Sequence, residues 1–159
     1  MRFEFTLNGR AHAIEGAPFE RLVDRLAEVG LTSVRKSCGV GRCGTCMVLL
    51  DGAPVNACLL VLGKLPGRRV VTAEGLGEEA DAIVVALGER GAIQCGYCAP
   101  GMLVSMAAAA GDPRCVDRGE AELRLEGNLC RCSGYSGFRA VLDDLLGMGF
   151  RLKTRSQIV

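Results

Sequence analysis

The chain has 159 residues, 49% of them hydrophobic, so it is long enough for one ordinary domain or two small ones with packed cores. Its 19 basic and 18 acidic residues leave a net charge of +1, and no run of Lys or Arg offers a footprint for nucleic acid. The chain start lacks the apolar segment of a secretory signal, and no apolar stretch reaches the ~20 residues of a membrane span. We therefore expect a cytoplasmic protein that neither binds nucleic acid nor spans a membrane.

Nine cysteines are many for such a chain. In a reducing compartment disulfides are disfavoured, and dense cysteines more often bind metal. The single histidine, His12, excludes a Rieske-type centre, which needs two histidines on one iron. Because no Ser-His-Asp or metal-hydrolase motif is present, we expect the chain to supply no catalytic acid, base or nucleophile.

The first elements are predicted from apolar spacing. Alternating apolar side chains over residues 2–7 favour a half-buried strand, and Asn8–Gly9 favours a hairpin turn into a second strand over 11–15. A helix is expected next, beginning near Pro18, continuing with apolar residues at helical spacing from Leu22 to Val29, and stopping at Gly30.

The Gly- and Cys-rich segment from Ser37 to Thr45 indicates a tight loop around a bound group. Strands are predicted over 47–50, 55–61 and 69–72. A small sheet that packs on one helix is an α+β arrangement.

After Gly75 the pattern becomes helical. Ala- and Leu-rich segments separated by Gly, Pro or Asn predict helices over 80–87, 101–110, 121–125 and 138–146. We therefore place a domain boundary near residues 74–78, with domains over 1–75 and 76–159. The last residues, 151–159, are mostly polar and are expected to fray or to follow a partner surface.

Cysteine spacing predicts the first metal site. The pattern C-x4-C-x2-C-x11-C is the plant-type ferredoxin spacing for a [2Fe–2S] cluster, and structural zinc sites more often show two short C-x2–4-C pairs. Glycines in the loop let it wrap closely and point N–H groups at the cluster sulfurs. The predicted ligands, here called the first site, are Cys38, Cys43, Cys46 and Cys58.

A second set of cysteines has the spacing C-x2-C-x31-C-x-C, which by itself fits zinc as well as iron. A redox cluster nearby favours a second one as its relay. These cysteines, here called the second site, are Cys95, Cys98, Cys130 and Cys132, and Cys115 is left over as a lone thiol without a ligand role.

Three segments, KSCGVGRCGTC, QCGYCAPGM and EGNLCRCSGY, occur in that order. Together they resemble the iron–sulfur subunit of molybdenum hydroxylases, a family that includes xanthine dehydrogenase, aldehyde oxidoreductase, carbon monoxide dehydrogenase, nicotinate dehydrogenase and quinoline oxidoreductase. The resemblance covers Phe3 to about Gly147. It implies a plant-ferredoxin-like β-grasp domain followed by an all-α four-helix domain, each binding one [2Fe–2S] cluster.

The resemblance also implies the surroundings of the clusters. The first would lie nearer to flavin and the second nearer to molybdenum, and Gln94 and Cys132 would contact the pterin of a molybdopterin (cytosine dinucleotide) cofactor. The implied partners are a large molybdopterin-binding subunit and a medium FAD-binding subunit, in a dimer of heterotrimers. Electrons would pass from molybdenum through both clusters to FAD, and the substrate would be a purine or another N-heterocycle.

Three residues depart from the family pattern. Ser133 stands where Thr is usual, Thr45 stands where Ala is common, and Arg42 adds a charge that bears on the potential of the first cluster. Arg35 and Lys36, just before the loop, are expected to be a solvated pair. Two alternatives remain: a stand-alone ferredoxin-like carrier, which the weak charge of +1 disfavours, and a zinc-stabilised interaction module.

Overall fold

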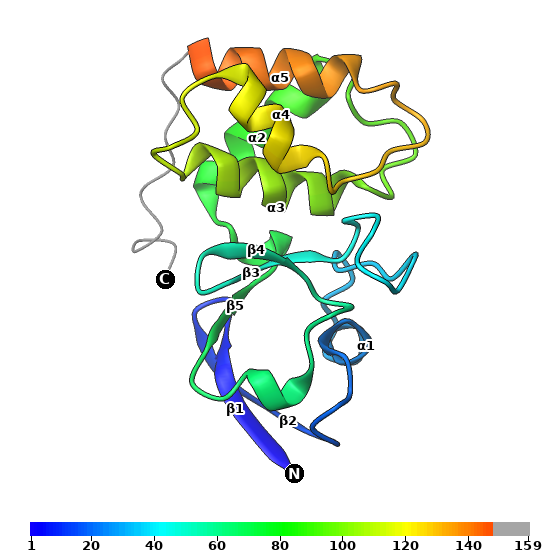
Figure 1. Ribbon diagram of the computed structural model, residues 1–159, viewed down its shortest axis with the longest axis vertical. Helices are drawn as coiled ribbons and strands as arrows, with labels where there is room; N and C mark the ends of the chain where they lie inside the picture. The colour runs from blue at the N-terminus through cyan, green and yellow to red at the C-terminus, as the bar shows by residue number, and fades with distance from the viewer. Residues whose placement is uncertain (148–159) are drawn as a thin grey trace.

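A computed structural model describes residues 1–147, apart from the side chain of Glu79. This part of the chain forms a sheet with one helix at the N-terminal end and a group of four helices that stack on the sheet (Figure 1). The polar segment expected over 151–159 lies outside the described residues.

The sheet is mixed and has the strand order β2-β1-β5-β3-β4. β1 and β5 are parallel, and the other neighbouring strands are antiparallel. The β1–β2 turn is the predicted hairpin, with Asn8 and Gly9 both in the left-handed region at φ 49° and 77°. The strands are β1 Arg2–Leu7, β2 Arg10–Glu15, β3 Met47–Leu50, β4 Ala53–Asn56 and β5 Arg69–Val71.

Helix α1 (Leu22–Glu28) packs its apolar face into the core beneath the sheet. The expected start near Pro18 was wrong, because the chain first makes a bridge between Arg21 and Val61, and the Pro18 carbonyl accepts a hydrogen bond from Gly63. The helix therefore begins four residues later than expected.

The strand predicted over 55–61 was also wrong in its length. β4 ends at Asn56, and the chain then turns, with Leu59 N–H donating to the Asn56 carbonyl at 2.9 Å. The turn carries Cys58 inward beneath the loop, whereas a continued strand would carry it along the sheet. Apolar residues in a partly buried turn give the same sequence signal as a strand, which explains the error.

A short 3₁₀ turn at Leu62–Lys64 connects β4 to β5, and a second at Ala73–Gly75 leads from β5 to four helices, as predicted. Asp117 caps one of them by accepting the N–H of Glu120 at 2.9 Å. Among the described residues, no helix is both long and apolar enough to cross a bilayer. The helices are α2 Glu78–Glu89, α3 Ala99–Ala110, α4 Arg118–Leu125 and α5 Ser136–Gly147.

β3 belongs to both cores. Met47 and Leu49 pack with the four helices, whereas Val48 packs with α1 and the N-terminal strands. α3 therefore covers the face of the sheet opposite α1 (Figure 1). The domain boundary near residues 74–78 stays a prediction.

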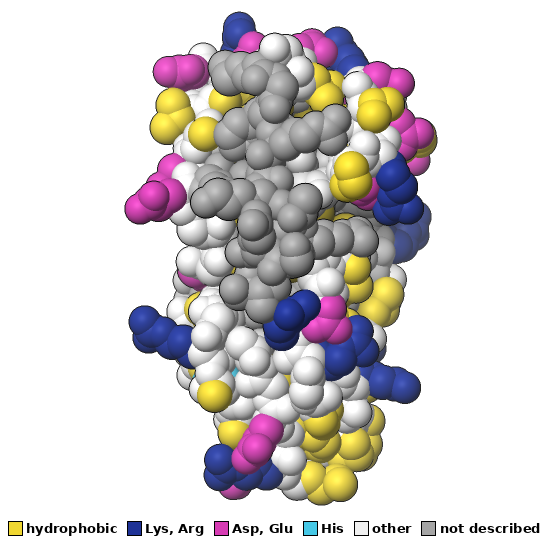
Figure 2. Space-filling view, turned by 90° about the vertical axis from the view of Figure 1, so that its left-hand side faces the viewer, with side chains coloured by type: hydrophobic (Ala, Val, Ile, Leu, Met, Phe, Trp, Pro, Cys, Tyr) yellow, Lys and Arg dark blue, Asp and Glu magenta, His cyan; other side chains and the backbone are white. Residues whose placement is uncertain are grey.

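Basic and acidic side chains are interspersed over the described part of the face shown in Figure 2. This mixture agrees with the near-zero net charge and leaves no broad field of one sign on that face.

Candidate iron–sulfur sites

The loop before β3 wraps around the sulfurs of the first site. The N–H groups of Val40 and Arg42 donate to Cys38 Sγ at 3.5 and 3.3 Å, and Gly41 N–H donates to Cys58 Sγ at 3.3 Å. Gly41 has φ 75°, a conformation that side-chain-bearing residues rarely adopt, and a Cβ there would clash with Leu59. The loop therefore directs its donors inward, as the sequence predicted.

These contacts set the acidity of the sulfurs in opposite directions. Hydrogen bonds from the N–H groups of Val40 and Arg42, together with the Cys43 thiol, lower the pKa of Cys38 to about 6. Burial raises the pKa of Cys46 to about 12, with its neighbour Cys58 adding to the rise. The strongest interactions among these sulfurs thus join Cys38 to Cys43 and Cys46 to Cys58.

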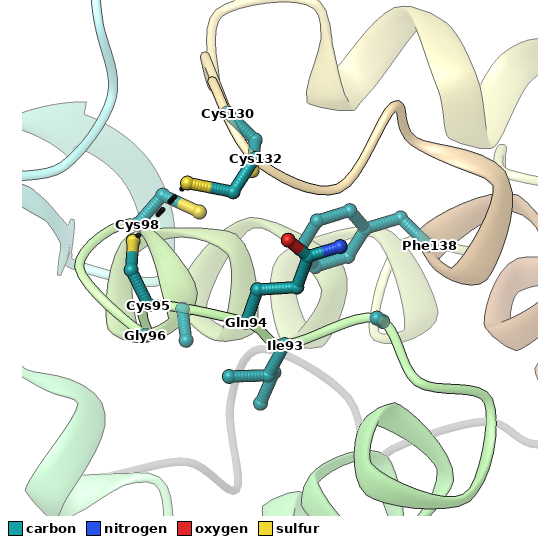
Figure 3. A pocket seen from close by; sticks show the side chains of 10 residues that line it. Ile93, Gln94, Cys95, Gly96, Cys98, Cys130, Cys132 and Phe138 are labelled. Carbon is teal, nitrogen blue, oxygen red and sulfur yellow. Dashed lines mark hydrogen bonds between the residues drawn. The ribbon is translucent and has the colours of Figure 1, made fainter.

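The second site is built from two loops that the sequence separates by more than thirty residues. One loop runs from Ala92 into the first turn of α3, and the other joins α4 to α5. Gly137, at the start of α5, packs so closely on the loop before α3 that a Cβ would lie 2.6 Å from Ala92 Cα. This close approach brings Cys95 and Cys132 together, with their sulfurs 3.5 Å apart (Figure 3).

Side chains of the loop between α4 and α5 form hydrogen bonds with the cysteines of the second site. Ser133 Oγ donates to Cys130 Sγ at 3.1 Å, and the Cys130 N–H donates to the phenol oxygen of Tyr135 at 2.8 Å. Burial raises the pKa of Cys130, but the hydrogen bonds from Ser133 and Cys132 outweigh it and lower the pKa to about 7. Ser133 therefore supplies a hydroxyl donor to the sulfur of Cys130.

The remaining sulfurs of the second site follow the same division. The N–H of Tyr97 lowers the pKa of Cys95, whereas burial raises that of Cys98 to about 12. Cys98 also interacts with Cys130, so this site too has two pairs: Cys95 with Cys132, and Cys98 with Cys130.

Gln94 lies at the outer rim of the second site. Its side chain is exposed and extends toward the space beside Cys132 and Phe138 (Figure 3). Cys132 is exposed as well. The two residues expected to touch a pterin therefore lie together at the surface, and their contact with a cofactor stays a prediction.

The two sites are joined through their loops. Leu129 N–H, next to Cys130, donates to the carbonyl of Cys43 at 2.9 Å. Asn128 is 2% exposed; its Nδ2 donates to the Gly44 carbonyl at 3.2 Å, and its Oδ1 accepts from Ser105 Oγ at 2.7 Å. Cys43 and the second-site cysteines line one cleft of about 550 Å³. The loop of the first site therefore packs directly on the loop between α4 and α5.

Sequence reasoning missed this junction. A lone Asn before a cysteine motif gives no sign of a partner more than eighty residues away. The solvated pair expected at Arg35 and Lys36 was wrong for Arg35, whose Nη1 donates to the Gly96 carbonyl at 2.5 Å in a partly buried position. Lys36 is exposed and pairs with Asp24 at 2.6 Å.

The donor set suits a two-iron cluster. Within residues 1–147, no three or more His, Cys, Asp and Glu side chains are grouped around a single metal position. The sulfurs lie in pairs, and a [2Fe–2S] cluster takes two thiolates on each iron, whereas tetrahedral zinc takes four ligands on one ion. The inward N–H groups are the donors that cluster sulfurs accept. The buried Cys115 lies outside both sets.

Comparison with known families agrees with this geometry. Residues 5–64 match a 2Fe-2S iron-sulfur cluster binding domain, and residues 72–142 match a [2Fe-2S] binding domain. Each match contains one of the two cysteine sites.

Relatives and solved structures extend the likeness over nearly the whole chain. A probable xanthine dehydrogenase subunit from Bacillus subtilis (strain 168) is 42% identical over 139 residues, which are 86% of this chain and 80% of the relative. The nicotinate dehydrogenase small FeS subunit of Eubacterium barkeri is 39% identical over 140 residues, 86% of this chain and 88% of the relative.

A chain of quinoline 2-oxidoreductase from Pseudomonas putida 86 superposes with a TM-score of 0.83 at 35% identity, over 94% of this chain and 98% of that one. The plant-ferredoxin-like and helical [2Fe–2S] domains expected from the sequence are therefore confirmed. This chain belongs to the family of iron–sulfur subunits of xanthine dehydrogenase- and aldehyde oxidoreductase-type molybdenum hydroxylases, which are oxidoreductase complexes.

Proposed function

We propose that this chain binds one [2Fe–2S] cluster at each cysteine site and relays electrons between two partner subunits of a molybdenum hydroxylase. Each cluster, when bound, accepts and releases one electron at a time. The chain's own residues supply the thiolates and the hydrogen bonds to sulfur, and they hold the two sites at a fixed separation.

One observation carries the relay: the 2.9 Å hydrogen bond from Leu129 N–H to the Cys43 carbonyl. It connects a ligand of the first site to the residue bonded to Cys130, a ligand of the second. Electrons that enter the helical domain thus have a short bonded and hydrogen-bonded route to the ferredoxin-like domain. A stand-alone carrier has no need of a second site held against the first in this way.

The exposed ends of the relay suggest where the partners bind. Cys132 and Gln94 are exposed at the second site, and Cys38 is exposed at the first. We propose that a large subunit with a molybdopterin (cytosine dinucleotide) cofactor meets Gln94 and Cys132, and that a medium FAD subunit lies beyond Cys38. The assembly would be a dimer of heterotrimers in the cytoplasm.

The substrate class comes from the relatives. The names of three of them refer to xanthine, nicotinate and quinoline, which are all N-heterocycles, whereas others are aldehyde oxidoreductases at lower sequence identity. We therefore propose that the large partner hydroxylates a purine or another N-heterocycle, and that this chain contributes no catalytic residue to that step.

Electron paramagnetic resonance on the complex purified through a tag on this chain tests the proposal. After reduction, two distinct [2Fe–2S] signals are expected, together with co-purifying molybdopterin and FAD subunits. Zinc bound at the second site, or a monomer without partners, would contradict the relay.

Single cysteine variants assign the clusters. Cys46→Ser is expected to remove only the first-site signal, and Cys98→Ser only the second, because each loses one of its four thiolates. Cys115→Ala is the matched control, since Cys115 is buried but lies outside both sites. Loss of a cluster signal in the Cys115 variant would contradict the ligand assignment.

A further inference from the structure

Arg35 links the two cysteine loops through its backbone and its side chain. Its N–H donates to the Thr45 carbonyl at 3.3 Å, and its own carbonyl accepts Thr45 Oγ1 at 3.0 Å. Both bonds fix its backbone to the first loop. Its guanidinium reaches across to the loop of the second site that precedes α3, where Nη1 donates to the Gly96 carbonyl at 2.5 Å. Gly96 follows the ligand Cys95 directly.

The guanidinium is held on a second side by an aromatic ring. It lies 5.3 Å from the ring centroid of Tyr97, within the range of a cation–π contact. The Tyr97 hydroxyl in turn donates to the Lys36 carbonyl at 3.0 Å. The Arg35 side chain thus contacts the loop that carries Tyr97, and the Tyr97 side chain contacts the backbone next to Arg35. Both loops therefore fix the position of the positive charge.

The charge is only partly compensated. Among the side chains that the structure describes, no carboxylate lies within ion-pair distance of Arg35, whereas the neighbouring Lys36 pairs with Asp24. Arg35 is half-buried, and a partly buried charge is screened by salt much less than an exposed one.

Reduction of an iron–sulfur cluster adds one negative charge to it. A fixed cation beside the cluster stabilises the reduced form more than the oxidised form, and so raises the reduction potential. Arg35 has its charge next to the Cys95–Cys98 loop and so acts most on the second site.

From this geometry, and on the basis of the function proposed above, we propose that Arg35 is a redox-tuning residue. Its guanidinium, fixed between the loops, raises the reduction potential of the second cluster relative to the first. It thereby sets the equilibrium distribution of one electron between the two clusters.

A natural comparison exists within the chain. Arg21 Nη1 donates to the Gly39 carbonyl at 2.7 Å, next to the ligand Cys38, so it repeats the Arg35 contact at the first site. Arg21 is exposed, and water screens its charge. Arg21→Gln therefore serves as a matched control for Arg35→Gln.

The test is a potentiometric titration of the purified complex, followed by electron paramagnetic resonance of each cluster. Arg35→Gln removes the charge but keeps a donor for the Gly96 carbonyl. It is expected to lower the second-cluster potential and to shift the one-electron equilibrium about fivefold toward the first, equal to about 40 mV. Arg35→Lys keeps the charge and is expected to stay within about twofold of the wild type, as is Arg21→Gln.

Unchanged potentials in an Arg35→Gln complex with two intact signals would overturn the inference alone. An equal shift in Arg35→Lys would also overturn it, because lost geometry rather than lost charge would then be the cause. Absence of two cluster signals in the wild-type complex would overturn the proposed function, and the inference with it. If Arg35→Gln does not retain both clusters, Arg35→Met makes the same comparison.

Discussion

Burial and hydrogen bonds divide the sulfurs of each site into two classes. Cys46 is buried, with a pKa raised to about 12, whereas Cys38 is exposed and hydrogen-bonded, with a pKa lowered to about 6. At the second site Cys98 and Cys130 repeat the contrast in pKa, although both are half-buried. Hydrogen-bond donors thus gather on one sulfur of each site more than on the others, and those donors adjust the charge on the sulfur.

Ser133 offers the clearest test at this scale. Its hydroxyl donates to Cys130 Sγ at 3.1 Å, so Ser133→Ala removes one donor from the second site. Since a net hydrogen bond contributes about 0.5–1.5 kcal/mol, we expect the second-cluster potential to fall by about 20–60 mV. A titration of both clusters measures it, with Ser133→Thr, which keeps the hydroxyl, as the control. A fall in Ser133→Thr of equal size would contradict this role.

At the scale of elements, α3 determines where the first loop lies. Gly101, in the first turns of α3, is buried against the loop backbone, and a Cβ there would clash with the Gly44 carbonyl. Gly44 is equally confined, since a Cβ on it would lie 2.5 Å from the Gly127 carbonyl. Three segments distant in the sequence meet at these glycines.

We expect Gly101→Ala to destabilise the chain by about 1–3 kcal/mol, because the added methyl must displace backbone. Gly88→Ala is the opposite case: Gly88 lies in α2 with open space around it, so the change should stabilise by about 0.5–1 kcal/mol through helix propensity. Urea unfolding of the two variants measures both effects. A neutral Gly101→Ala would mean that α3 and the loop separate easily.

The segment before α4 is fastened by Asp112, which is 5% exposed. Hydrogen bonds from the side chain and N–H of Arg114, joined by Arg124, hold the pKa of Asp112 well below its usual range. A carboxylate with a depressed folded-state pKa stabilises the fold above its unfolded pKa of about 3.9, and this contribution is lost as pH falls through the folded value.

Asp112→Asn is therefore expected to cost about 1–3 kcal/mol near neutral pH, and the gap to wild type should close as pH falls below about 4. Thermal unfolding of both proteins across pH 2–7 measures the gap. Asp144, paired with Arg90 at the surface, provides the control, and Asp144→Asn should cost less, about 0–1 kcal/mol. A gap that stays constant with pH would contradict the charged role of Asp112.

For the whole molecule, Asn128 is the buried polar link between the two halves. It forms hydrogen bonds with Ser105 in α3 and with the Gly44 carbonyl in the loop of the first site. The N–H of the adjacent Leu129 donates a hydrogen bond to the Cys43 carbonyl. A buried amide with both partners in place stabilises one relative position of the two loops.

Asn128→Leu leaves the Gly44 carbonyl and the Ser105 hydroxyl unpaired and is expected to cost about 2–3 kcal/mol. We also expect weaker magnetic interaction between the two reduced clusters, because their separation becomes less fixed. Paramagnetic resonance at low temperature and urea unfolding measure the two effects. Ser105→Ala keeps the hydrogen bond from Asn128 to the Gly44 carbonyl and should preserve the magnetic interaction. Loss of that interaction in the Ser105 variant would contradict the role of Asn128.

The sequence by itself determined the local features of this protein. Apolar alternation was enough for β1, the Asn8–Gly9 pair for its hairpin, and Ala- and Leu-rich segments between Gly, Pro or Asn for the four helices, since each depends on neighbours a few residues away. The cysteine spacing and three short motifs were enough for the family and its [2Fe–2S] domains, because ligand loops need a fixed local geometry. Local signals also misplaced the start of α1, where Pro18 precedes a bridge and not a helix, and lengthened β4, where apolar residues continue into a turn.

Only the tertiary structure decided how the two sites meet. Asn128 bonds a carbonyl 84 residues earlier, and Arg35 crosses from one loop to the other, contacts that no sequence spacing encodes. The sharing of β3 between two cores is of the same kind, because which face of a strand meets which helix depends on packing. Local periodicity and ligand spacing act over a few residues, whereas the distance and charge between two clusters are set by segments that only folding brings together.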